Sequence, residues 1–597
     1  MNIAVTTSDE KPSPSHVPRR MKSHWWRGIV SISTAVLVAL LTVSGSGASA
    51  AGRTPGAAPP TQDPQLALMK AEAAASKNAY KNLFGGKKPS CAAMAGEWIK
   101  DDAGDAQLLT SREVSARDVP ISAEDAGGAV MTNLKGETVP TPRHCEVSGY
   151  IAPQVAFELR MPDPQAWNGR FMLVACAGFC GSVSSSGCNP GLSRGYAVVT
   201  TNGGHAGSPG FEATWAQGDN AARHDFAYRA NHVATLLSKE IVNSYYGKPA
   251  DYSYVAGCSK GGNSAVRYAS RYPADFDGIL ASAPVLDYQR RLSTSFSWQA
   301  QAIEKNGKAV LSPADLTVLH GYILNQCDRL DGRADGVLND PDACKPDFAA
   351  MACKPSKASQ KCFSNVQINA LRKLYALPSD SRGRVIYSAA QTPGSELNAT
   401  PWLTEMPGVP GTPLVEHGAN QWLRYMAYSR QSDGYNKSAL NFTFDHDPAD
   451  MEAMAKVYNS TATDLRRFEK LGGKLLITHG TADEGIGLAA TVDYYKQLVT
   501  ASGGLATTQS FARLFQVPGM AHCSGGAGYD RFDALSALES WVERGTPPKE
   551  IVARRSSPHA ANEAIPLYPY PLVPKYRGTG DPADPASYRA VTSASWR

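Results

Sequence analysis

The chain has 597 residues, of which 43% are hydrophobic and 19% charged, with 11 cysteines and a formal charge of +5. This composition excludes an intrinsically disordered chain, a collagen and a small scaffold held by disulfides alone. The length suits either several domains or one large enzyme domain with insertions.

Residues 1–50 have the pattern of a secretory signal peptide. Basic residues from Arg19 to Arg27 precede an apolar run from Ile29 to Val43, and Ala48-Ser49-Ala50 supplies small residues for cleavage. The apolar run is short for a membrane span, which makes an uncleaved anchor the alternative interpretation. We therefore expect a secreted protein without stable membrane association after cleavage.

The positive charge is concentrated in this leader. No run of Lys and Arg follows it, so nucleic acid is not an expected partner. Secretion also exposes the cysteines to an oxidising compartment, where disulfides form. Because 11 is an odd number, at least one cysteine has no partner within the chain.

Apolar strand-like stretches alternate with helical ones between about residues 145 and 284. The stretches at 170–175, 196–200 and 252–256 resemble strands, and 229–245 resembles a helix, which predicts an α/β fold with a largely parallel sheet. The alternation stops after Pro284 and returns near Lys474. The long segment between them is typical of an inserted domain rather than a loop.

The strongest catalytic motif is Gly257-Cys258-Ser259-Lys260-Gly261, which follows a β-branched apolar segment and precedes a helical one. This is the strand, sharp turn and helix of a nucleophile elbow, in which Ser259 would be the nucleophile. An ordinary glycine-rich turn is the alternative. A phosphate-binding P-loop is excluded because its spacing is absent.

A serine nucleophile requires a base and an acid that orients the base. Asp483 follows the apolar stretch at 474–478, and His522 follows a second one at 514–517. The order Ser, Asp, His is that of α/β-hydrolases. Taken singly, Asp483 could instead be a turn-forming residue and His522 a surface histidine.

Two cysteines flank this predicted triad. Cys258 precedes Ser259 and Cys523 follows His522, so a disulfide between them would hold the two catalytic loops together. The alternative is that both are small buried apolar residues.

This Cys-Ser, Asp, His-Cys arrangement resembles the tannase and feruloyl esterase family, which includes hydrolases of mono(2-hydroxyethyl) terephthalate. The resemblance extends from about residue 90 to 590. It includes residues 145–149 (CEVSG), 167–171 (WNGRF), 194–198 (RGYAV), 201–205 (TNGGH), 272–279 (YPADFDGI) and 569–571 (PYP).

The resemblance implies an α/β-hydrolase fold with a large inserted lid domain. We expect a catalytic domain in two parts, 51–285 and 466–597, and a lid at 286–465 that covers Ser259 and binds the aromatic acid of the substrate. The family's oxyanion donors correspond to the backbone amides of Lys260 and Gly178. Ala175, Cys176 and Ala177 stand where the family usually has glycines.

The inserted segment contains closely spaced aspartates between turn-forming glycines, a pattern that suits a hard cation with oxygen ligands. An EF-hand is excluded by the spacing, and a solvated acidic loop is the alternative. The resemblance implies a structural Ca²⁺ and no organic cofactor. The implied ligands are the carboxylates of Asp328, Asp331 and Asp335 and the carbonyls of Arg333 and Val337.

Proximity and the resemblance also imply three more disulfides: Cys91 with Cys145, Cys327 with Cys344, and Cys353 with Cys362. Among Cys176, Cys180 and Cys188 we expect one pair and one thiol.

The sequence thus predicts a secreted serine carboxylic ester hydrolase that cleaves esters of aromatic acids, such as feruloyl or galloyl esters. A terephthalate monoester hydrolase of the same family is an alternative. A peptidase of the same fold and a non-catalytic binding protein on a hydrolase scaffold are more distant alternatives.

Overall fold

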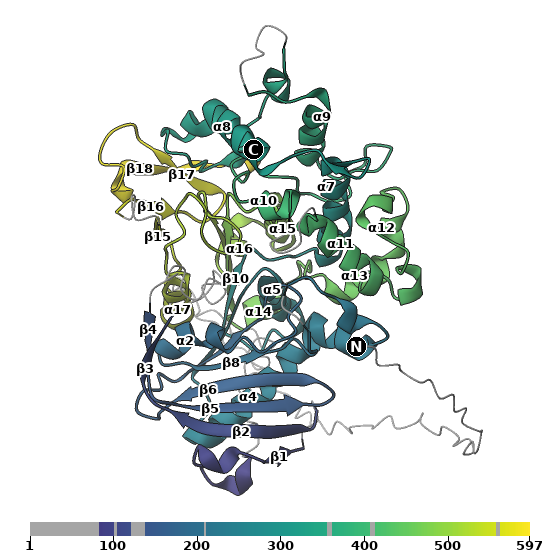
Figure 1. Cartoon of the computed structure of the whole chain (residues 1–597). Coiled ribbons are helices and arrows are strands. Elements are labelled where there is room, and N and C mark those ends of the chain that lie inside the picture. Colours follow the sequence, from purple (N-terminus) through teal and green to yellow (C-terminus); the bar gives the residue numbers. More distant parts are fainter. Residues whose placement is uncertain are drawn as a thin grey trace, which may run out of the picture. The chain divides into compact units, whose positions relative to one another are not determined.

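A ten-stranded mixed sheet organises the described part of the chain (Figure 1). The computed structural model describes residues 83–100, 104–120, 138–207, 210–354, 361–405, 412–556 and 562–596. The leader at 1–50 lies outside these residues.

The strands run in the order β1-β2-β5-β6-β8-β7-β9-β10-β13-β14. From β8 to β14 neighbouring strands are parallel, whereas β1, β2, β5, β6 and β8 pair antiparallel. This confirms the α/β prediction and adds an antiparallel edge. The bounds are β1 Trp98–Ile99, β2 Ala106–Val114, β5 His144–Ile151, β6 Val155–Pro162, β7 Arg170–Val174, β8 Ala197–Thr201, β9 Tyr252–Cys258, β10 Gly278–Ser282, β13 Lys474–Gly480 and β14 Ala512–Val517.

Helices cover both faces of the parallel strands, which explains why these strands are almost continuously apolar. Alternate residues of one strand belong to different cores: Val255 packs with one cluster, and Tyr254 and Ala256 with another. The first cluster includes side chains of α4 (Ala230–Tyr246), α5 (Lys260–Arg271) and α15 (Leu488–Ala501). The second includes side chains of α2 (Asn189–Ser193) and α17 (Ala534–Arg544).

The chain leaves the sheet after β10 and returns at β13, which pairs directly with β10 in parallel register. The segment between them is mainly helical (Figure 1). Its apolar side chains, such as Leu319, Leu371 and Trp422, form a cluster that also includes Phe179 and Phe226 from earlier in the chain. Its helices are α6 Tyr288–Arg290, η6 Arg291–Ser295, α7 Phe296–Ile303, α8 Pro313–Cys327, η7 Asp328–Asp331, α9 Asn365–Leu374, α10 Thr400–Leu403, α11 Leu414–Tyr425, α12 Asp447–Asp450 and α13 Glu452–Tyr458.

All described residues belong to one compact unit, so the domain boundaries at 285 and 465 stay a prediction. The remaining elements are β3 Arg117–Pro120, β4 Thr138–Thr141, α3 Asn220–His224, β11 Glu304–Lys305, β12 Lys308–Ala309, α14 Arg466–Lys470, α16 Leu505–Gln509, β15 Ile551–Arg554, β16 Ala564–Leu567, β17 Leu572–Tyr576 and β18 Tyr588–Thr592. None of the helices in the described ranges has the length and apolarity needed to cross a membrane.

Five disulfides are present. Four are the pairs expected from the sequence, and the fifth joins Cys176 to Cys180, which leaves Cys188 as a buried thiol. One pair and one thiol were expected among these three. The four expected pairs are Cys91–Cys145, Cys258–Cys523, Cys327–Cys344 and Cys353–Cys362.

Candidate active site

Ser259 lies in a tight turn between β9 and α5. Its φ of 59° and ψ of −117° lie in a region that residues with a side chain rarely adopt. The turn needs its glycines, because a Cβ on Gly257 would lie 2.5 Å from the backbone of Gly261. A Cβ on Gly261 would lie 2.6 Å from the carbonyl oxygen of Ala175. The local geometry is that of a nucleophile elbow.

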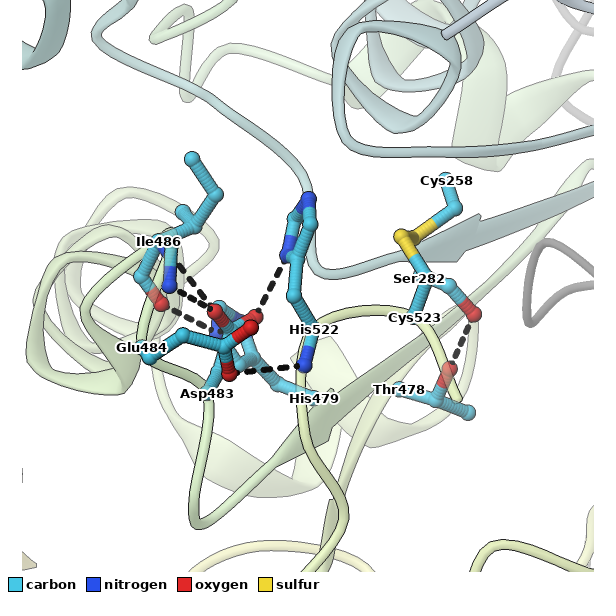
Figure 2. The surroundings of a disulfide bond; sticks show 10 residues. Cys258, Ser282, Thr478, His479, Asp483, Glu484, Ile486, His522 and Cys523 are labelled. Carbon is cyan, nitrogen blue, oxygen red and sulfur yellow. Dashed lines mark hydrogen bonds and ion pairs between the residues drawn. A yellow bond between two sulfur atoms is a disulfide. The ribbon is translucent and has the colours of Figure 1, made fainter. Parts of the chain in front are cut away.

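Asp483 and His522 meet at the carboxyl ends of the neighbouring strands β13 and β14 (Figure 2). The Nδ1 atom of His522 donates to Oδ2 of Asp483 over 2.9 Å. The other carboxylate oxygen of Asp483 accepts the backbone amides of Gly485 at 2.8 Å and Ile486 at 2.7 Å. The acid is therefore fixed by its own loop while it orients the imidazole.

The ionisation of this pair suits a base and its orienting acid. Burial acts to raise the pKa of Asp483, but the charge of His522 and hydrogen bonds from two histidines hold it well below its usual range. Burial acts to lower the pKa of His522, but the charge and hydrogen bond of Asp483 outweigh it. The pKa of His522 consequently lies above its ordinary value of 6.5.

A disulfide brings the serine loop to the histidine loop. Cys258 and Cys523 are bonded with their Cα atoms 6.0 Å apart, across a sequence separation of 265 residues. Since Ser259 follows the first cysteine and His522 precedes the second, the bond fixes the loop of Ser259 beside that of His522. The structure thus places the three predicted catalytic residues at one end of the sheet.

Two residues near Asp483 were missed by the sequence analysis: His479 at the end of β13 and Glu484 on the loop that follows. His479 is fully buried, and its Nε2 lies 3.3 Å from Oδ2 of Asp483 while donating to the carbonyl of Ile486 over 2.9 Å. Glu484 accepts the backbone amide of His522 over 3.2 Å (Figure 2). The only sequence signal was two adjacent acidic residues directly after a strand.

The predicted oxyanion donors lie on the loops that flank the serine. The amides of Phe179, Cys180 and Gly181 donate to backbone carbonyls, and the assignment of Gly178 as the donor on this loop stays a prediction. Gly178 has a φ of +59°, and a Cβ there would lie 2.9 Å from a carbonyl oxygen. Its own carbonyl accepts the Tyr288 hydroxyl of α6 over 3.1 Å.

The Lys260 side chain points into the protein interior. It is 2% exposed, its ammonium donates to Ser264 Oγ over 2.6 Å, and it lies 4.7 Å from the ring centre of Phe226. Burial and the positive charge of Arg267 lower the pKa of Lys260 to about 7.

Aromatic side chains from the inserted segment adjoin His522. The ring of Trp402, in α10, lies edge-on at 6.0 Å from the imidazole. Trp402 in turn contacts Phe211 at 6.1 Å and Phe296 at 6.0 Å, and Phe211 contacts Phe179 beside the oxyanion loop at 5.1 Å. We call Phe179, Phe211, Phe296 and Trp402 the aromatic wall.

The predicted calcium loop is only partly arranged as expected. Asp335 is paired with the guanidinium groups of Arg333 at 3.1 Å and Arg555 at 2.8 Å. Within the described ranges, no group of three or more His, Cys, Asp or Glu side chains is arranged to hold a metal ion.

The other two aspartates of this loop accept backbone amides: Asp331 accepts those of Arg333 and Asn339, and Asp328 accepts that of Gly336. Asp331 is buried, and its pKa is raised to about 7 by burial and by the negative charges of Asp335 and Asp328. A divalent ion would offset this repulsion. The full ligand set, with the carbonyls of Arg333 and Val337, stays a prediction.

Comparison with known proteins gives consistent matches. The sequence model of a family described as "Tannase and feruloyl esterase" matches residues 140–591. The chain is 34% identical to the mono(2-hydroxyethyl) terephthalate hydrolase of Piscinibacter sakaiensis over 520 residues, covering 74% of this chain and 83% of that protein. It is 31% identical to the probable feruloyl esterase B-2 of Aspergillus flavus over 419 residues, covering 66% and 76%.

The structure of the chain is also similar to solved structures of esterases. Feruloyl esterase B from Aspergillus oryzae aligns with a TM-score of 0.71 and 25% identity, covering 83% of this chain and 98% of that one. The tannin acyl hydrolase from Aspergillus niger aligns with a TM-score of 0.66 and 20% identity over 87% and 95%, which supports the fold.

Proposed function

Because the chain belongs to the tannase and feruloyl esterase family of carboxylic ester hydrolases, we propose that it is a secreted serine esterase that cleaves esters of aromatic acids. Ser259 is the proposed nucleophile, His522 the base and Asp483 the residue that orients the base. The observation that carries the proposal is the 2.9 Å hydrogen bond between Asp483 and His522, at the same end of the sheet as the strained Ser259.

In the proposed reaction, His522 takes the Ser259 hydroxyl proton as the oxygen attacks the ester carbonyl. Asp483 stabilises the resulting imidazolium, which donates its proton to the leaving alcohol. Water, deprotonated by His522, then attacks the acyl-enzyme, and the imidazolium returns this proton to the Ser259 oxygen as the acid is released. The amides of Lys260 and Gly178 would stabilise the negative oxygen of both tetrahedral intermediates, a contribution of a few kcal/mol.

The aromatic wall supports an aromatic acid as the acyl group. Trp402 and Phe211 lie between His522 and the oxyanion loop, where the acyl part of a bound ester would be placed. Rings in such positions bind planar substrates by stacking or edge contacts. A feruloyl or galloyl ester fits this environment.

A terephthalate monoester is the second candidate, favoured by the 34% identity to the Piscinibacter sakaiensis enzyme. Turnover of methyl ferulate, methyl gallate and mono(2-hydroxyethyl) terephthalate by one preparation distinguishes the candidates. We expect at least one of these three aromatic esters to have a higher kcat/KM than methyl butyrate. Preference for methyl butyrate would contradict the aromatic assignment.

Secretion is supported by the five disulfides, which are typical of proteins folded in an oxidising compartment. N-terminal sequencing of protein recovered from the culture medium tests cleavage near Ala50. We also propose a structural Ca²⁺ at Asp328 and Asp331, which takes no part in ester cleavage.

A further inference from the structure

We propose that Glu484 is a positioning residue for the catalytic base: its carboxylate holds the backbone of His522 and adds a second negative charge beside the imidazole. This inference rests on the proposed role of His522 and goes beyond the Ser, His and Asp triad.

Consecutive carboxylates hold His522 at two points. Asp483 accepts from the ring Nδ1 over 2.9 Å, and Glu484 accepts from the backbone amide over 3.2 Å. Figure 2 shows the two carboxylates on the same side of the His522 residue, one at the ring and one at the main chain. A shift of either acid would therefore change the position of the imidazole.

The loop that carries both acids is itself anchored to the inserted segment. The buried guanidinium of Arg291, in η6, donates to the carbonyl of Gly485. The same guanidinium donates to Ser295 over 2.5 Å, so its position is fixed within the lid. The residues on both sides of Glu484 are therefore held in place: Asp483 by its hydrogen bond with His522, and Gly485 by the hydrogen bond from Arg291.

The titratable groups packed around Glu484 and His522 come from three elements. Asp483 lies on the loop after β13, and His479 lies near the end of that strand; His522 follows β14, and Arg291 comes from η6. Burial and the negative charge of Asp483 raise the pKa of Glu484 to about 7, whereas the charge of His522 lowers it. The carboxylate of Glu484 raises the pKa of His522, and Arg291 lowers it.

Glu484 and His522 consequently titrate as a pair, with each favouring the charged form of the other. When His522 accepts the Ser259 proton, an ionised Glu484 stabilises the imidazolium in addition to Asp483. The expected consequence is a stronger base at neutral pH. Because the pKa of His522 is raised, acidification protonates the base, and stops the reaction, at a higher pH than it would without Glu484.

Replacement of Glu484 by Gln tests this, since Gln keeps an oxygen acceptor for the His522 amide but removes the charge. The rate of phenyl acetate hydrolysis is measured from pH 5 to 9 for wild type and E484Q. In E484Q we expect the pKa of His522 to fall by about one unit. The acidic side of the pH profile, where activity is lost as His522 becomes protonated, should therefore move about one unit to lower pH. At higher pH, where kcat no longer changes with pH, kcat should be about tenfold lower than in wild type. KM should be unchanged.

Two further variants of Glu484 and one control complete the experiment. Glu484→Asp keeps the charge, so its activity should fall at nearly the same acidic pH as that of wild type. Glu484→Ser removes the charge with a smaller side chain and replaces E484Q as the test if E484Q folds poorly. It should shift the acidic side of the pH profile as E484Q does. Glu113→Gln is the matched control, because Glu113 is 60% exposed on β2 and should change nothing. An acidic side of the pH profile that is unchanged in both charge-removing variants would overturn the proposal and leave Glu484 a structural residue. Full activity of Ser259→Ala would instead refute the triad itself.

Discussion

Cys258 and Cys523 are joined by a disulfide that connects the residue before Ser259 to the residue after His522. The two strands that carry these loops, β9 and β14, are separated in the sheet by β10 and β13. Strand pairing alone therefore does not fix the distance between these two loops, and the disulfide fixes it beside the proposed catalytic residues.

Removal of this disulfide should reduce both catalysis and stability. In Cys258→Ser/Cys523→Ser we expect kcat to fall on the order of a hundredfold, because an ångström of displacement has that effect. Loss of the long closed loop should lower the free energy of unfolding by about 5 kcal/mol. Steady-state kinetics and denaturant unfolding measure the two effects.

The matched control is Cys353→Ser/Cys362→Ser, whose loop has a sequence separation of 9. It should cost about 3 kcal/mol by the same loop-entropy relation and leave kcat within twofold. Equal loss of kcat in the two double variants would show that the bond at the active site has no special catalytic role.

Lys260→Met should stabilise the protein while retaining the backbone amide. The pKa of Lys260 is about 7 in the folded chain, below its ordinary 10.5. The unfolded chain therefore binds more protons between these values, and stability increases as pH rises through this window. The gain from the substitution should be largest below pH 7 and disappear near pH 10.5. Tm values of both proteins at pH 6 and 9 check this; a gain independent of pH would contradict it.

Trp402→Leu should weaken discrimination for aromatic acids. Leucine retains an apolar side chain at this buried position, but it removes the ring that lies 6.0 Å from His522. Aromatic contacts contribute about 0.5–1.5 kcal/mol, so kcat/KM for methyl ferulate should fall about three- to tenfold. Hydrolysis of methyl butyrate, measured in parallel, should stay within twofold. An equal loss for both esters would place Trp402 outside the acyl-binding site.

Removal of calcium should lower Tm without stopping catalysis. The proposed ion offsets the repulsion among Asp328, Asp331 and Asp335, so EDTA should reduce Tm by several degrees and added Ca²⁺ should restore it. Asp328→Asn should reduce the difference between the two conditions. A wild-type Tm that is identical in EDTA and in Ca²⁺ would refute the site.

Local sequence patterns predicted much of this structure. The strand at 252–256 and the glycines around Ser259 specify the elbow, because only glycine fits where a Cβ would meet backbone atoms 2.5 Å away. The alternation of strands and helices predicted the α/β fold, and the order of Ser259, Asp483 and His522 matched it, since parallel strands place their carboxyl ends at one edge of a sheet. The flanking cysteines indicated the disulfide.

What the sequence left undetected depends on contacts between distant segments. The position of Trp402 beside His522 arises from packing of the inserted helices and has no local motif. Glu484 has no local motif either, because its partner is a backbone amide 38 residues further along the chain. The pairing of Asp335 with Arg555 likewise joins segments 220 residues apart, so the acidic loop alone could not reveal it.

The most direct test of the account is Ser259→Ala, assayed with phenyl acetate and methyl ferulate and compared with Ser293→Ala, a buried serine of η6. Ser259→Ala should lose at least a thousandfold in kcat with an unchanged Tm, and a fluorophosphonate probe should label wild type but not this variant. Ser293→Ala should keep its labelling and most of its activity. Hydrolysis by Ser259→Ala at the wild-type rate would contradict the assignment of Ser259 as the nucleophile.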